Sequence, residues 1–206
     1  VVDGNQGALP WTAPVSFEKE SYKMKLPKQV ADQIEANQSE MLETLRTLIA
    51  FPSIATAEPE DGYPFGKPCA DALRFMLQKA EQMGFSAQNF DDYIGSVDWM
   101  PEAQQQPELG ILCHLDVVPV LAENWSSDPF VMEERDGCLF GRGCIDDKGP
   151  AVAVLYAMKA IRDAGIPLQK NVRFIMGCNE ENGSSDLEYL SLIHISEPTR
   201  RRGISY

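Results

Sequence analysis

Apolar runs of strand length alternate with a helical segment in the second half of the chain, and this alternation constrains the fold most. The runs "ELGILCHLDVVPV" (108–120) and "NVRFIMGCNEE" (171–181) are typical of buried strands. Between them, "GPAVAVLYAMKAIRDAG" (149–165) is apolar nearly all round, which predicts a buried helix with Pro150 in its first turn and Gly165 at its end. A strand, a helix and a strand in this order predict an α/β sheet.

Further elements precede and interrupt this unit. Apolar residues at three- and four-residue spacings predict a helix within 26–51, and a second helix fits 69–84, with Gly84 as its stop. Residues 85–99 alternate loosely and predict a strand. The segment 130–143 predicts a hairpin that turns at Asp136-Gly137.

Composition excludes several classes of function. The net charge of −13 argues against binding to nucleic acids or anionic membranes, and a solvated acidic surface is its simplest interpretation. No apolar run approaches membrane-spanning length. The five cysteines form no CxxC pair and are odd in number, so they predict neither a disulfide framework nor a zinc ribbon. Free thiols suggest a reducing cytoplasm.

Three polar clusters follow or end apolar segments. In "CHLDVVP", His114 and Asp116 are two residues apart and would face the same side of an extended segment. An imidazole beside a carboxylate is the usual arrangement of a metal-ligating histidine and the group that orients it. A structural hydrogen bond between the two is the alternative.

The other two clusters are pairs of carboxylates. Asp146 and Asp147 precede the predicted buried helix, and two adjacent like charges call for a cation or for solvent. Asp147 can instead cap that helix. Glu180 and Glu181 end an apolar strand, where one can hold a metal while its neighbour handles a proton. A hydrated loop would explain this second pair equally well.

Taken together, the clusters resemble the co-catalytic zinc metallopeptidases of the aminoacylase, carboxypeptidase G and carnosinase type. "HLDVVP", "GRGCIDDKGP" and "NEENGSSD" match that family's H-x-D, G-R-G-x-x-D and E-E-x-G blocks. "PFGK" (64–67) and "NWSSDPF" (124–130) are most similar to its bacterial branch of PepV-type and Xaa-His dipeptidases. Many members carry Asp where this chain has Asn179. This difference is expected to change the hydrogen bonds around the metal ligands and not the reaction.

The resemblance implies a fold and a set of roles. The fold would be the N-terminal part of a zinc-peptidase catalytic domain, with a mixed central sheet flanked by helices and without the family's lid domain. His114 would bind one zinc ion, Glu181 the other, and Asp146 would bridge both, with Mn²⁺ or Co²⁺ as alternatives to Zn²⁺. Asp116 would orient His114, and Glu180 would be the general base. The substrate would be a small peptide.

The resemblance covers residues 24–189 and predicts the boundaries of the native sequence. Residues 1–23 are expected to be translated upstream DNA or a disordered native segment. Residues 190–206 are expected to be foreign, because "LSLIHISEPTR" matches the translation of a transposon-based sequencing adapter, although a short basic native tail is the alternative. His194 would then not be a ligand. The family's later acidic and histidine ligands would be missing, so the chain alone is expected to be inactive.

Three other functions remain open. The first keeps the family but changes the substrate, as in an N-acyl amino acid deacylase or desuccinylase. The second is a metal-free homologue that acts as a binding module. The third is a cysteine hydrolase that uses Cys113 and a histidine, although adjacent residues on a strand point to opposite faces.

Overall fold

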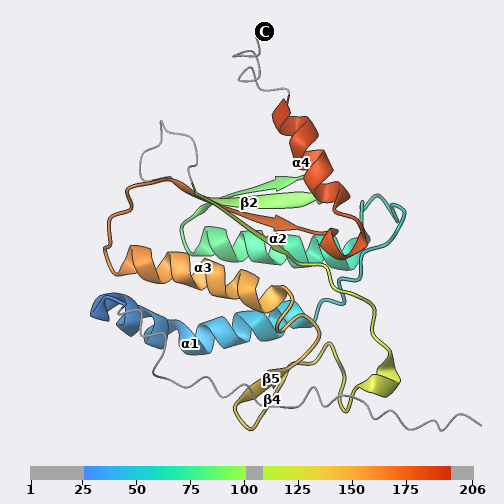
Figure 1. Ribbon diagram of the computed structural model, residues 1–206, viewed down its shortest axis with the longest axis horizontal. Helices are drawn as coiled ribbons and strands as arrows, with labels where there is room; N and C mark the ends of the chain where they lie inside the picture. The colour runs from blue at the N-terminus through green and yellow to red at the C-terminus, as the bar shows by residue number, and fades with distance from the viewer. Residues whose placement is uncertain (1–25, 101–108, 196–206) are drawn as a thin grey trace, which may run out of the picture.

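The computed structural model describes residues 26–100 and 109–195, which form a sheet with helices on both sides (Figure 1). The expectations for residues 1–23 and 196–206 lie outside these ranges. Within the ranges, no helix combines the length and apolar character needed to cross a membrane. The elements in chain order are α1 (Lys28–Ile49), α2 (Lys67–Gln82), β1 (Ser86–Phe90), β2 (Ile94–Trp99), β3 (Leu109–His114), η1 (Ala122–Asn124), β4 (Glu133–Arg135), β5 (Cys138–Phe140), α3 (Lys148–Asp163), β6 (Val172–Gly177), η2 (Glu180–Asn182) and α4 (Ser185–Ile195).

The main sheet has the order β1-β2-β6-β3 and is mixed, as expected. Strand β6 pairs antiparallel with β2 and parallel with β3. Helix α3 makes the crossover between the parallel strands, which no tight turn can join. Because β3 and β6 run in the same direction, their last residues, His114 and Gly177, lie opposite each other. Whatever follows these two strands therefore meets at one edge of the sheet.

The hydrophobic core lies between the sheet and its helices. Helix α2 packs on β1 and β2, α3 packs on β3 and β6, and α1 packs on α3 as a further layer (Figure 1). Phe174 and Met176 of β6 and Leu155 of α3 are fully buried within it. Helix α4 lies on the opposite side of the sheet (Figure 1). Residues 190–195 continue this helix, and the prediction that they are foreign stays a prediction.

Helices α1, α2 and α3 and the β4–β5 hairpin agree with the sequence prediction, whereas α4 was not predicted and residues 85–99 do not form one strand. They form the hairpin of β1 and β2, which turns at Asp91 and Asp92. Both aspartates have positive φ, as type I′ turns require, and Asp tolerates this conformation. The side chain of Asn89 accepts a hydrogen bond from the Asp92 amide and further fixes the turn.

Gly95 in β2 allows α2 to approach the sheet, so a larger residue there should destabilise the protein. A Cβ atom at Gly95 would lie 2.9 Å from Leu73 and 3.0 Å from Leu77 of α2. We expect Gly95→Val to lower the free energy of unfolding by about 2 kcal/mol, measured by urea denaturation, because overpacking strains a dense core. Gly110→Val is the matched control at an exposed position of β3, where a Cβ would meet nothing within 4 Å. An equal loss in both variants would contradict the packing argument.

Candidate metal centre

The parallel ends of β3 and β6 bring the first and third polar clusters together. His114 is the last residue of β3, and Glu180 and Glu181 lie in η2, just beyond β6. One potential ligand atom from each of these three side chains lies within 4.8 Å of the others. The imidazole is buried, whereas the two glutamates are exposed. Residues separated by more than 60 positions in the sequence thus form one cluster.

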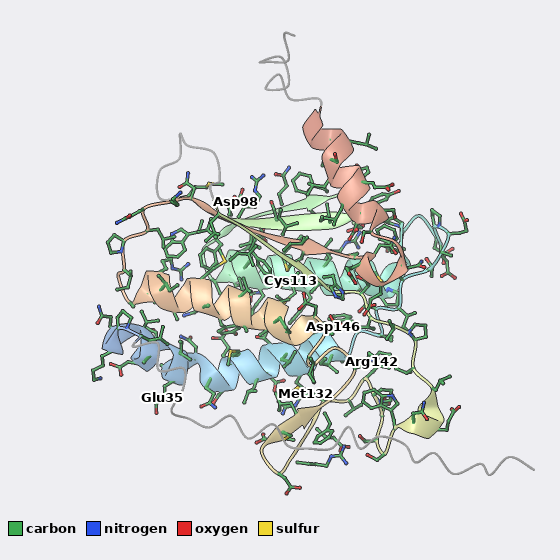
Figure 2. The ribbon with its side chains drawn as sticks, in the orientation of Figure 1. Glu35, Asp98, Cys113, Met132, Arg142 and Asp146 are labelled. Carbon is green, nitrogen blue, oxygen red and sulfur yellow. The ribbon has the colours of Figure 1, made fainter. Side chains whose placement is uncertain are left out.

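Asp146 joins this cluster from the N-terminal end of α3 (Figure 2). Its Oδ1 atom lies 3.1 Å from Nε2 of His114, and Oε2 of Glu180 lies 3.7 Å from the same nitrogen. The Asp146 side chain is largely exposed, so it can also reach a solute. One imidazole nitrogen therefore faces carboxylates from two separate segments.

Asp116 contacts both His114 and the backbone of η2. It is fully buried, and its Oδ1 atom lies 3.3 Å from Nδ1 of His114. The same carboxylate accepts hydrogen bonds from the backbone amides of Glu180 (3.1 Å) and Glu181 (3.0 Å). The His114–Asp116 pairing expected from the sequence is present. Its contact with η2 was not foreseen, because it joins segments 64 residues apart.

The charges around His114 favour a cation. Burial lowers the pKa of His114, but hydrogen bonds and charge from Asp116, followed by Asp146, outweigh it and raise this pKa to about 9. Burial and the neighbouring Asp146 raise the pKa of Glu181. Neighbouring carboxylates contribute to both shifts, and a bound divalent cation would relieve this crowding of negative charge. Imidazole nitrogen and carboxylate oxygen are suitable ligands for Zn²⁺, so the residues fit a metal site.

Asp147 bonds to the backbone of β3 and lines the same cavity as His114 and Glu180. It occupies the N-cap position of α3, as the capping alternative expected, but its side chain makes no capping hydrogen bond. Its carboxylate instead accepts a hydrogen bond from the His114 backbone amide (3.1 Å). It also lies near Cys113, a residue of β3 marked in Figure 2. Burial, with Asp147 adding to it, raises the pKa of this thiol to about 12, which disfavours Cys113 as a nucleophile.

Two buried charged residues beside the site were not singled out from the sequence. Lys148 is fully buried, and its Nζ atom donates to the carbonyl oxygens of Leu48 (3.1 Å) and Phe51 (2.7 Å). Burial lowers the pKa of this ammonium to about 8. Asp186, at the start of α4, is also buried. Both lie within motif segments quoted above, but their burial depends on contacts that no local pattern reveals.

Asn179 shows how its departure from the family pattern is accommodated. It is buried, and its Nδ2 atom donates to Oγ of Ser185 (2.7 Å). Within the part of the chain that the structure describes, its Oδ1 atom has no hydrogen-bond partner. An asparagine is thus accommodated beside Glu180 with its amide nitrogen hydrogen-bonded.

Comparisons with known proteins show which proteins this chain is similar to. Residues 110–204 match the sequence profile of "Peptidase family M20/M25/M40". The chain is 42% identical over 127 residues to a "Putative dipeptidase YtjP" of Bacillus subtilis. The alignment covers 62% of this chain and 26% of that protein. It is 38% identical over 157 residues to a "Beta-Ala-Xaa dipeptidase" of Lactobacillus delbrueckii. This alignment covers 75% of this chain and 33% of that protein.

The fold is similar to that of solved peptidases. Human carnosine dipeptidase 1 superposes with a TM-score of 0.70 at 26% identity, over 81% of this chain and 37% of the human chain. The yeast dipeptidase Dug1p, at 19% identity and a TM-score of 0.69, shares the fold. The chain thus spans about a quarter to a third of the length of the curated relatives named above.

Proposed function

We propose that the chain is part of a peptidase of family M20/M25/M40 and that the complete protein is a metal-dependent dipeptidase. One observation carries the proposal: His114 shares the edge of the sheet with the carboxylates of Asp146, Glu180 and Glu181. A peptide bond is poorly reactive, and a cluster of this composition can hold divalent cations next to a group that accepts protons.

The metal ligands on this chain would be His114, Asp146 and Glu181. His114 and Glu181 would each hold one ion, and Asp146 would lie between the two ions. The donor set suits Zn²⁺, with Mn²⁺ and Co²⁺ as alternatives. When bound, such ions make water more acidic and polarise the carbonyl group of the substrate.

Glu180 would be the general base. Its exposed carboxylate, 3.7 Å from the His114 ring, can accept a proton from water and then pass it to the leaving amine. Asp116 would orient the His114 ring through Nδ1, leaving Nε2 free for a metal. Its two hydrogen bonds to η2 would hold the base and the ligand at a constant distance from that ring.

The substrate would be a small peptide, as the names of the two bacterial relatives suggest. A cavity of about 240 Å³ opens beside His114 and is lined in part by Leu112, Gly177 and Leu187. Its polar wall includes Glu180. All five cysteines are free, which supports a reducing compartment such as the cytoplasm.

Substrate panels with and without a chelator test the proposal on the complete protein. We expect hydrolysis of dipeptides, its loss on chelation, and its return with Zn²⁺, Mn²⁺ or Co²⁺. His114→Ala should abolish turnover, whereas Cys113→Ser should keep most of it because no thiol takes part. Hydrolysis of N-acyl amino acids alone would replace the dipeptidase assignment with a deacylase. Activity that survives complete metal removal would refute the metal mechanism.

A further inference from the structure

Two buried carboxylates hold four consecutive backbone amides at the turn that carries the proposed base. Asp116 accepts hydrogen bonds from the amides of Glu180 and Glu181, as described above. Asp186 accepts them from the amides of Cys178 (2.7 Å) and Asn179 (3.0 Å). The segment 178–181 is therefore fixed by one carboxylate that follows β3 and by a second one from α4.

Asp186 is buried with only backbone donors around its carboxylate in the described residues. It is 1% exposed, and its hydrogen-bond donors are the amides of Cys178, Asn179 and Leu187. A buried charge is costly unless hydrogen bonds compensate for it. Hydrogen bonds to a charged acceptor are also stronger than neutral ones. The position of Asp186 in the first turn of α4, where the helix dipole favours an anion, adds to this compensation.

Gly177 makes this approach possible. A Cβ atom on Gly177 would lie 2.3 Å from Oδ2 of Asp186, far inside contact distance. Gly177 is the last residue of β6 and pairs with His114. The Asp186 carboxylate therefore occupies the space that a side chain at the end of β6 would fill, directly beside the candidate metal centre.

We propose that Asp186 is a positioning residue that sets the direction in which Glu180 and Glu181 leave β6. It acts through the backbone of residues 178 and 179 and does not touch the reacting atoms. This inference rests on the proposed function, because positioning matters only if Glu180 and Glu181 act on a metal site. Without Asp186, Asp116 would still hold the amides of Glu180 and Glu181. The amides of Cys178 and Asn179, which connect β6 to this turn, would lose their hydrogen-bond acceptor.

Replacement of Asp186 in the complete protein tests the inference. We expect Asp186→Ala to lower kcat by about 10- to 100-fold, as for the loss of a group that orients metal ligands, with KM nearly unchanged. Asp186→Asn should retain most of the activity, because Cys178 and Asn179 both donate to the single oxygen Oδ2, which an amide oxygen can replace. A rise in KM without a fall in kcat would mean that Asp186 contacts substrate, and would overturn the inference.

Gly177→Ala is an independent test, because the added methyl group should displace the Asp186 carboxylate. It should lower kcat about as much as Asp186→Ala does. In the Asp186→Ala background it should have little further effect, since the clash is gone, so the two changes should be strongly non-additive. Additive losses would overturn the inference. If Asp186→Ala does not fold, a low kcat in Gly177→Ala together with a near-normal kcat in Asp186→Asn supports the inference. A near-normal kcat in Gly177→Ala together with a low kcat in Asp186→Asn refutes it.

Asp98→Ala serves as the control for a purely structural effect. Asp98 forms a two-point ion pair with Arg173 on the same sheet, so its loss should reduce thermal stability but leave kcat unchanged. Co²⁺ binding, followed by visible absorption, is measured on all variants and does not depend on turnover. If wild-type protein binds Co²⁺ but cleaves no peptide, the proposed function fails. Weaker Co²⁺ binding by Asp186→Ala would then still support positioning, and equal binding would refute it.

Discussion

Glu180→Gln in the complete protein should lower kcat by about 10³-fold while its metal content stays at the wild-type level. The amide keeps the size of the side chain and cannot accept the proton, and general bases contribute on the order of 10² to 10⁴ in rate. The metal should remain because the change leaves the proposed ligands His114, Asp146 and Glu181 intact. Dipeptide hydrolysis and elemental analysis of the same preparation measure both quantities.

Glu188→Gln is the matched control for this experiment. Glu188 is an exposed glutamate of α4, so the same loss of charge occurs outside the cluster around His114. It should leave kcat unchanged. A Glu180→Gln enzyme with near-normal turnover would remove Glu180 from the role of base, whatever its metal content.

Asp146→Asn should lose metal and turnover together. The carboxylate lies 3.1 Å from Nε2 of His114 and is the one proposed ligand that would be shared by both ions. Two cations a few ångströms apart repel each other, and a neutral amide does not offset that repulsion as a carboxylate does. We expect Zn²⁺ affinity to fall by at least about 10-fold, with turnover falling by about 10³-fold. Dialysis against buffered Zn²⁺ followed by elemental analysis gives the affinity.

Asp136→Asn controls for the substitution itself. Asp136 lies in the β4–β5 turn with φ of 51°, a conformation that Asn adopts readily, so stability and metal content should not change. If Asp146→Asn kept its full metal content, Asp146 would be no ligand. A loss of turnover would then need another explanation, such as an altered position of His114.

Local patterns in the sequence predicted most elements and the members of the cluster, whereas tertiary contacts decided how they are held. Helices α1, α2 and α3 and the turn at Asp136-Gly137 follow from periodicity and turn chemistry, whereas α4 was not predicted. The turn at Asp91 and Asp92 was missed, because two aspartates are a weaker turn signal than Asn-Gly or Asp-Gly. The parallel pairing of β3 with β6 explains why motifs more than 60 residues apart converge.

The burial of polar and charged side chains could not be predicted from the sequence. Lys148 and Asp186 belong to residue types that are mostly exposed, so a single sequence predicts solvated side chains at both positions. Their burial depends on α1 and the residues just after it, which supply carbonyl oxygens to Lys148, and on the residues just after β6, which supply amides to Asp186. The same holds for Asp116, whose hydrogen bonds to Glu180 and Glu181 depend on the register of the sheet.

The alignment of His114 with Gly177 also has a consequence for how the chain selects its native state. Parallel strands have no connecting turn to fix their register, and a slip of one residue turns every side chain of a strand to the opposite face. A slipped β3 would direct His114 away from Glu180 and Glu181, so under the proposed function only the native alignment would hold a cation at this edge. Binding to the native state alone stabilises it in proportion to the logarithm of ligand concentration. A higher metal concentration would therefore favour the native register of β3 over slipped registers.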